Sequence, residues 1–200
     1  MALIISADEI KKQLPDYSPE KAEFFHRQSS KLADKEFEVA IRKNPFKEVI
    51  LLSGGAASGK TEFLVTQLNQ KRCVIFDATL DTIERAKIKI KTILRRKKKP
   101  VIYAVIPDDL KRAFIAFLNR DRKFSDEHFY RTHSGSRKTL LWIASNYANV
   151  KINIVESSYT KDQILQFAKV GFNSKKQMIN YLSRLELSGS DIISIVSKEL

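Results

Sequence analysis

One stretch of eight residues, 54–61, constrains this chain more than any other. It reads Gly-Gly-Ala-Ala-Ser-Gly-Lys-Thr and directly follows the apolar run Val49–Leu52. A strand, a turn of the form Gly-x-x-x-x-Gly-Lys-Thr and a helix start are together typical of a phosphate-binding loop. The glycines let successive backbone N–H groups point inward, and the following helix adds unpaired N–H groups and the positive end of its dipole. We therefore predict that this glycine loop binds a nucleoside triphosphate.

The members of the glycine loop have individual predicted roles. Lys60 is expected to reach the β- and γ-phosphates, and the hydroxyl of Thr61 is expected to hold Mg²⁺. The predicted nucleotide-binding residues are Gly54, Gly55, Ala56, Ala57, Ser58, Gly59, Lys60 and Thr61. The alternative is a glycine- and serine-rich turn without a ligand. The flanking strand and helix patterns favour nucleoside triphosphate binding over this alternative.

Composition excludes several classes of protein. The 200 residues, 43% of them hydrophobic, suit one globular domain, alone or with an appendage. No apolar stretch approaches the roughly 18 residues of a membrane span, and the N-terminus lacks the basic region of a signal peptide. Cys73 is the only cysteine and lies in a predicted strand, which excludes a disulfide framework. We expect Cys73 in the core of a protein from a reducing, cytoplasmic setting.

The chain is strongly basic, with a formal net charge of +13. Such an excess suits nucleic acid, a membrane surface or a site for polyanionic small molecules. The densest basic run, 95–99, ends a predicted helix, where cations complement the helix C-terminus. Aromatic residues are not interleaved with these cations, as a stacking platform for bases would require. Nucleic-acid binding is therefore an open but less favoured alternative, and no membrane partner is predicted.

The N-terminal segment, residues 1–47, is predicted to be a helical extension. Ser18-Pro19-Glu20 has the form of an N-cap followed by proline in the first helical turn. Helical character continues to about Arg42, where Asn44-Pro45 ends it. The predicted buried positions of this helix are Phe25, Leu32, Phe37 and Ile41.

Residues 48–158 alternate between strand and helix patterns. The predicted strands are Glu48–Ser53, Cys73–Phe76, Val101–Ile106 and Ile152–Val155. The predicted helices start at Lys60, at the capping-box pair Asp81 and Glu84, after Pro107-Asp108-Asp109, and at Ser125, with a break at Ser134-Gly135-Ser136. This alternation implies a parallel sheet covered on both sides. The predicted fold class is α/β, a P-loop NTPase three-layer sandwich with a mainly parallel sheet and extra N- and C-terminal helices.

Residues 159–200 show only helical patterns and are predicted to pack on the 48–158 core or to meet a partner. Thr160 and Gln163 have capping-box spacing, and Gly171 is a predicted stop. The expected apolar stripes are Met178, Leu182 and Leu185, then Ile192, Ile193, Val196 and Leu200.

A phosphate-binding loop binds a nucleotide but does not by itself determine which reaction the protein catalyses. Phosphoryl transfer needs a carboxylate near the γ-phosphate, and Asp77 is the leading candidate because it ends an apolar strand. Parallel strands present their carboxyl ends to ligands, so Asp77 could hold Mg²⁺ or accept a proton from a substrate hydroxyl. The alternative is that Asp77 merely ends the strand. Thr79 is predicted to contact substrate, and Asp81 is either a substrate contact or a helix cap.

Phosphoryl transfer also needs cations, and Arg120 and Arg122 are the predicted catalytic arginines. Their segment, 119–123, could close over the nucleotide as a lid. Residues two apart do not share a helix face, so we expect at most one to act directly unless the segment is irregular. A solvated basic turn is the alternative. Arg131 and Arg137 are candidates for a second phosphate contact, and we assign Arg137 to the substrate.

The three histidines do not form a predicted metal site. His26 is remote in sequence, and His128 and His133 lack the i, i+4 spacing of helical zinc ligands. His128 is therefore interpreted as structural. The Gly-x-Ser-x-Gly elbow of serine hydrolases is absent, and so is the Asn-Lys-x-Asp motif of guanine-specific switch proteins.

Taken together, these motifs resemble the zeta toxin and related small-molecule kinases. The stretch 52–62 resembles that family's loop, and 74–80 is similar to its strand ending in an acidic residue, a small residue, threonine and an apolar residue. The cluster 120–123 lies where those kinases carry phosphate-contacting arginines. The resemblance covers about residues 48 to 156. It implies ATP-dependent phosphorylation of a sugar hydroxyl, with UDP-N-acetylglucosamine as the family's substrate, and it suggests an antitoxin-like protein partner.

One departure from this family bears on the catalytic base. Those toxins usually carry a catalytic Asp on a separate strand between the loop helix and the acidic strand. About a dozen residues separate Lys60 from Cys73, too few for that strand. Either Asp77 serves both needs, or the base comes from elsewhere, or the reaction has changed.

Three functions follow from these patterns. The first is a kinase that phosphorylates a small-molecule hydroxyl. The second is a nucleic-acid-linked ATPase or polynucleotide kinase, and the third is a nucleotide-binding interaction protein without transfer activity. The concentration of candidate site residues favours the first.

Overall fold

A computed structural model describes residues 1–160 and 164–198. The strands are β1 (Leu3–Ser6), β2 (Glu48–Ser53), β3 (Val74–Asp77), β4 (Lys99–Pro107), β5 (Lys151–Tyr159) and β6 (Leu165–Val170). The α-helices are α1 (Ala7–Lys12), α2 (Ala22–Lys43), α3 (Lys60–Phe63), α4 (Ile83–Arg95), α5 (Leu110–Leu118), α6 (Asp126–Asn146), α7 (Lys175–Leu185) and α8 (Gly189–Ser197). Two short segments of other helical types are the 3₁₀ turn η1 (Pro19–Lys21) and the π-helical η2 (Leu64–Leu68).

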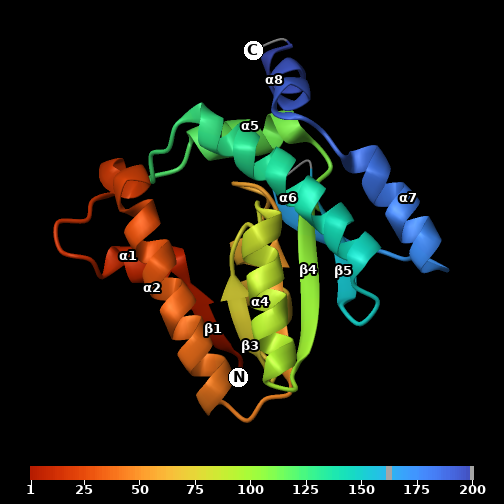
Figure 1. The fold of residues 1–200 in the computed structure, drawn as a ribbon. Coiled ribbons are helices and arrows are strands. Elements are labelled where there is room, and N and C mark those ends of the chain that lie inside the picture. Colours follow the sequence, from red (N-terminus) through yellow and green to blue (C-terminus); the bar gives the residue numbers. More distant parts are fainter. Residues whose placement is uncertain (161–163, 199–200) are drawn as a thin grey trace.

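The strands form one mainly parallel sheet in the order β1-β3-β2-β4-β5-β6 (Figure 1). Strands β1 to β5 run parallel to their neighbours, and β6 runs antiparallel to β5. β2, which leads into the glycine loop, lies centrally between β3 and β4. Its residues 49–53 are all buried, as expected for a strand covered on both faces. The predicted α/β class is thereby confirmed.

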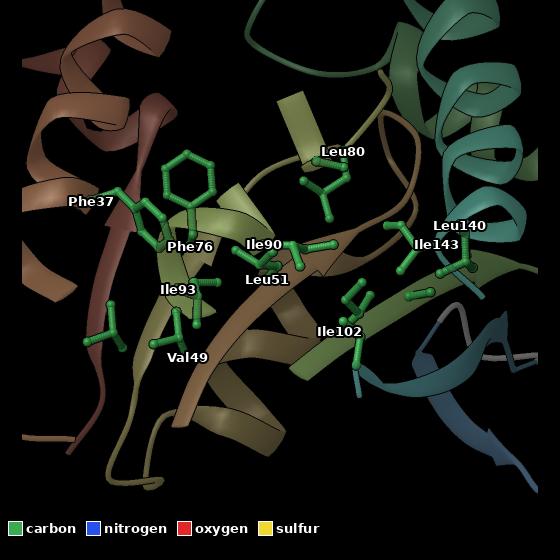
Figure 2. Packing of buried hydrophobic residues seen from close by; sticks show 14 of the residues in the cluster. Phe37, Val49, Leu51, Phe76, Leu80, Ile90, Ile93, Ile102, Leu140 and Ile143 are labelled. Carbon is green, nitrogen blue, oxygen red and sulfur yellow. The ribbon is translucent and has the colours of Figure 1, made fainter. Parts of the chain in front are cut away.

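Alternate residues of β2 point into two different cores, which lie on opposite faces of the sheet. Val49 and Leu51 meet side chains from α2, α4 and α6 (Figure 2). Ile50 and Leu52 pack instead with side chains of α3 and η2. Helices therefore cover both faces, an arrangement compatible with three layers.

A third apolar cluster covers the glycine loop. α5, α6 and α8 lie over the end of the sheet that carries the loop (Figure 1). Ala56 and Ala57 of the loop pack with Phe114, Phe117, Phe129, Ile192 and Val196. The loop is thus held between the sheet and a helical cap.

The N-terminal segment contains a strand as well as the predicted helix. β1 pairs in parallel with β3, and Ser6 is opposite Asp77 in the register. Leu3 and Ile4 remain 40% and 38% exposed, as fits an edge strand, and the strand is only four residues long. The description of residues 1–47 as purely helical is therefore wrong, because β1 belongs to the central sheet. Helix α2 matches the predicted helix, with Phe37 and Ile41 buried.

The C-terminal segment also differs from the prediction. Instead of helices alone, the chain after Tyr159 forms β6, which pairs with β5. Thr160 lies in this hairpin, where its backbone N–H donates to the carbonyl of Ile164. The predicted Thr160–Gln163 capping box reaches outside the described residues, as does Leu200. α7 and α8 match the later helical stripes, with Leu182, Ile192 and Val196 buried.

Two local predictions are wrong, the break within α6 and the cap of α4. The helix runs without a break through Gly135 because the glycine allows close packing: a β-carbon there would lie 2.2 Å from the carbonyl oxygen of Asp81. Asp81 does not cap α4, whose N-cap is Thr82. By contrast, α5 begins after Pro107-Asp108-Asp109 as predicted, and its N-cap is Asp109, whose side chain accepts hydrogen bonds from two backbone N–H groups. Within the described residues, no helix has both the length and the apolar character to cross a membrane.

Candidate active site

The backbone of the glycine loop needs conformations that most residues avoid. Gly54 and Gly59 have φ of 141° and 84°, and Ala57 adopts a left-handed φ of 58°. A β-carbon at Gly54 would lie 2.3 Å from the carbonyl oxygen of Val105 in β4. Gly54 is therefore required both by its φ and by the close approach of a neighbouring strand.

The glycine loop leaves a row of backbone donors free. Among the described residues, the N–H groups of Gly55, Ala57, Gly59, Lys60 and Thr61 have no hydrogen-bond acceptor. Unpaired N–H groups that gather at the start of a helix form an anion-binding site. This loop can therefore accept phosphate oxygens.

Lys60 supplies the cation of the glycine loop. Its ammonium group donates hydrogen bonds to the carbonyl oxygens of Gly54 at 2.9 Å and Gly55 at 2.7 Å. Burial lowers the pKa of Lys60 to about 8, against the opposing effect of Asp77. A phosphate group that approached this lysine would favour its charged form.

A pocket at the carboxyl edge of the sheet joins the glycine loop to Asp77. Lys60, Thr61, Asp77 and Thr79 all line it. Asp77 ends β3, and Ser6 donates a hydrogen bond to its Oδ2 at 3.3 Å. Burial raises the pKa of Asp77, while the nearby ammonium of Lys60 opposes that rise. Asp77 lies at the sheet edge where the sequence predicted it.

Asp8 is a second carboxylate of this pocket, and sequence reasoning missed it. It lies two residues beyond the end of β1, and the parallel register of β1 and β3 brings it to the same edge as Asp77. It forms ion pairs with Arg122 and with Lys11, the latter at 3.1 Å. Burial opposes ionisation of Asp8, but these two cations outweigh it and lower its pKa to about 2. The short apolar run Leu3–Ile5 was the signal in the sequence that could have indicated a strand before Asp8.

Both predicted arginines line the pocket. Arg120 and Arg122 follow α5 in an irregular segment, so the helical restriction on residues two apart does not apply. Arg120 has its pKa lowered by burial and by the neighbouring Arg122. The pocket thus brings Asp8 and Asp77 together with Lys60, Arg120 and Arg122, which come from four separate parts of the chain.

Two other predicted residues are bound to each other. The hydroxyl of Thr79 donates to Asp81 at 3.2 Å, and Asp81 also forms an ion pair with Arg131. Arg131 is therefore a partner of Asp81 in this structure. Thr79 remains at the pocket wall, where a substrate can reach it.

Arg137 is not in the pocket. It lies beneath the glycine loop, 6% exposed, and donates a hydrogen bond to Nδ1 of His133 at 3.1 Å. It is not among the residues that line the pocket, so this structure gives its predicted substrate role no support. Sequence spacing could not detect this, because the side chain's direction depends on how α6 packs against the loop.

Aromatic and imidazole rings form another part of the pocket wall. His26 from α2 and His128 from α6 lie with their ring centroids 5.4 Å apart, although they are remote in sequence. Phe117 and Phe124 complete this wall. Burial, followed by the effect of His26, lowers the pKa of His128 to about 4. Both rings are therefore neutral near pH 7, since burial also lowers the pKa of His26.

Cation-binding groups are sparse in this pocket. The described residues contain no group of three or more His, Cys, Asp or Glu side chains that could hold a metal ion. Thr61 and Asp77 still offer two hard oxygen donors beside the glycine loop. Mg²⁺ commonly keeps several waters and binds through one or two carboxylates together with substrate phosphates. The pair therefore fits Mg²⁺ that arrives with a nucleotide.

No family model matches this chain, and no curated protein matches it.

Proposed function

We propose that this protein is an ATP-dependent kinase with a P-loop NTPase core that phosphorylates a hydroxyl group of a small molecule. The observation that carries the proposal is a single pocket that joins the free loop amides and Lys60 to Asp8, Asp77, Arg120 and Arg122. A protein that only binds nucleotide needs the loop and the lysine. The carboxylates and arginines supply what transfer requires.

The proposed roles follow from charge and position. The loop amides and Lys60 bind the β- and γ-phosphates. Thr61 and Asp77 would hold Mg²⁺, which when bound neutralises phosphate charge. Arg120 and Arg122 stabilise charge on the phosphoryl group during transfer. Asp8 orients the acceptor hydroxyl and takes its proton.

The proposed step transfers the γ-phosphoryl group of ATP to the acceptor hydroxyl. The acceptor oxygen forms a bond to the γ-phosphorus while the bond between that phosphorus and the β–γ bridging oxygen breaks. Asp8 receives the hydroxyl proton, and ADP leaves. For Asp8 to do so, Arg122 must turn from this carboxylate toward the phosphates, since the two are paired in the free protein.

The resemblance to the zeta toxin family supports this proposal, and β1 removes the main objection to it. That family supplies its catalytic Asp from a strand separate from the acidic one. Here β1, from the N-terminal segment, lies beside β3 and is followed by Asp8. The base can therefore come from elsewhere in the chain, one of the alternatives open from the sequence. A sugar hydroxyl is the proposed acceptor.

The test is ATP consumption by the purified protein with Mg²⁺ and a panel of sugars and sugar nucleotides. Turnover should depend on one acceptor, and mass spectrometry should find that acceptor heavier by one phosphoryl group. Lys60→Ala should lower turnover by at least 100-fold, whereas Lys91→Ala, an exposed lysine on α4, should leave it unchanged.

Other outcomes would contradict the proposal. ATP loss without any acceptor would indicate a simple ATPase. Turnover that rises only with DNA or RNA would favour the nucleic-acid-linked alternative, and that stimulation should fall steeply with added salt.

A further inference from the structure

A buried set of polar side chains beneath the glycine loop has no part in the proposed transfer step. Thr132, His133 and Arg137 lie on α6 and are 1%, 0% and 6% exposed. Burying an imidazole and a guanidinium is costly unless their polar atoms are paired. The Nε atom of Arg137 has no partner, which makes the cost of this arrangement higher still.

These side chains hold both polar groups of one residue of the loop. The N–H of Ala56 donates to the hydroxyl of Thr132 at 3.1 Å. The carbonyl oxygen of Ala56 lies 2.8 Å from Nε2 of His133. Arg137 donates to Nδ1 on the other side of the same ring at 3.1 Å.

The hydrogen-bond chemistry allows one protonation state for the ring. A guanidinium can only donate, so Nδ1 of His133 must accept, and a carbonyl can only accept, so Nε2 must carry the proton. Complete burial, with Arg137 next, holds the pKa of His133 well below its ordinary value and so favours this neutral ring. Arg137 therefore sets the tautomer that lets His133 donate to the loop.

The glycine loop also rests directly on this ring. A β-carbon at Gly55 would lie 2.3 Å from the imidazole carbons of His133. Gly55 has no unusual φ, so the ring itself explains why this position is glycine. On either side of Ala56, the N–H groups of Gly55 and Ala57 remain free.

We infer that Thr132, His133 and Arg137 are positioning residues that fix the peptide groups of Ala56 and thereby aim the free N–H groups at phosphate. None of the three lines the substrate pocket. The inference rests on the proposed function, because it assigns to these residues control of nucleotide affinity. It predicts that nucleotide binding depends on the hydrogen bond from His133 more than on its bulk.

The first test compares His133→Gln with His133→Leu, by calorimetry with ATP and Mg²⁺. A glutamine amide can still donate toward the Ala56 carbonyl, whereas leucine fills similar space without a donor. We expect the Kd for ATP to rise at least tenfold in His133→Leu and less than threefold in His133→Gln. Equal affinity in His133→Leu and wild type would overturn the inference, and so would equal losses in both variants.

A second pair keeps the test decisive if the His133 variants do not fold. Thr132→Val removes the acceptor for the Ala56 N–H with little change of shape, and Thr132→Ser retains it. The valine variant should lose nucleotide affinity at least fivefold, and the serine variant should bind as wild type does. Wild-type affinity in the valine variant would argue against the inference.

Hydrogen exchange separates this inference from the proposed function. In the free protein, the hydrogen-bonded amides of Gly54, Ala56 and Ser58 should exchange at least tenfold faster in His133→Leu or Thr132→Val, while amides of β4 should not change. This readout needs no nucleotide. If wild type bound no ATP, the proposed function would fail, and the exchange result would still test the positioning role. Uniformly faster exchange throughout the chain would indicate a merely structural role.

Discussion

At the scale of single residues, Asp77 combines a cost in stability with a proposed role in metal binding. Its folded pKa is raised above the unfolded value of 3.8, mainly by burial. The folded state therefore binds this proton more tightly than the unfolded state does. Stability is lost as the pH rises from the unfolded pKa through the folded one, so at neutral pH the charged form destabilises the free protein.

We expect Asp77→Asn to stabilise the free protein at pH 7 by about 1 kcal/mol, because it removes a buried charge and keeps an acceptor for Ser6. The same variant should abolish phosphoryl transfer. Urea unfolding at pH 7 and at pH 3 checks the first part, since the gain should vanish where Asp77 is already protonated. Lower stability of the variant at pH 7 would contradict it.

Asp8 shows the opposite electrostatic behaviour. With a pKa of about 2 it stays ionised throughout any ordinary assay range. Asp8→Asn should lower kcat by about 10²–10⁴-fold, the usual worth of a general base, with the Kd for ATP within about threefold of wild type. Steady-state kinetics and calorimetry give the two values. An unchanged kcat would assign the proton transfer to Asp77 or to water.

At the scale of an element, the end of α4 explains the densest basic run of the chain. Lys97 adopts a left-handed φ of 54°, and the N–H groups of Lys97 and Lys98 donate to the carbonyls of Leu94 and Ile93. This is the Schellman pattern of a helix end. Lys98 also donates to the carbonyl oxygens of two residues in the α2–β2 connection, at 2.7 and 2.5 Å. The run therefore has a structural role.

Glycine suits the position of Lys97 better than lysine does. Lys97→Gly should stabilise the protein by about 0.5–1 kcal/mol, because glycine adopts positive φ without steric cost. Lys97→Ala is the matched control, since it loses the same charge and keeps the β-carbon, and it should not stabilise. Denaturant unfolding of both variants provides the comparison. An equal gain in both would attribute the effect to charge instead.

At the scale of the whole molecule, the pocket depends on chain segments that meet only in the folded state. Asp8 and His26 come from the N-terminal segment, the glycine loop and Asp77 from the centre, and the arginines from beyond α5. Residues 1–47 thus contribute both a strand of the sheet and a wall of the pocket. The site forms only when β1 is paired with β3.

All three histidines of the chain have folded pKa values below their ordinary value of 6.5, in each case mainly because of burial. Their stabilising contribution is therefore complete above pH 6.5 and is lost as the pH falls below it. For each histidine that stays neutral in the folded protein at pH 5, the free energy of unfolding should be about 2 kcal/mol lower at pH 5 than at pH 7.5. Denaturant unfolding at pH 7.5 and pH 5 measures the total.

The variant His128→Gln is the control for this pH dependence. It should lose less stability than wild type between the two pH values, because one buried imidazole is gone. Stability that does not fall at pH 5 would contradict the prediction.

Much of the architecture was predictable because it depends on patterns of residues that are close together in the sequence. The strand before the glycine loop, the loop itself and the strand that ends in Asp77 all lie in one stretch of about 30 residues. Periodicity also predicted α2, α5, α7 and α8, since each has an apolar face at helical spacing. The start of α5 after Pro107-Asp108-Asp109 was also predicted from local sequence.

Tertiary structure alone decided the rest. β1 is only four residues long and becomes a strand because β3, some 70 residues later, offers it a free edge. Asp8 enters the pocket by that pairing, and Arg137 leaves it because α6 turns this side chain beneath the loop. Local sequence encodes the period of an element and the chemistry of its turns. Which elements become neighbours depends on contacts between distant residues, which no short pattern contains.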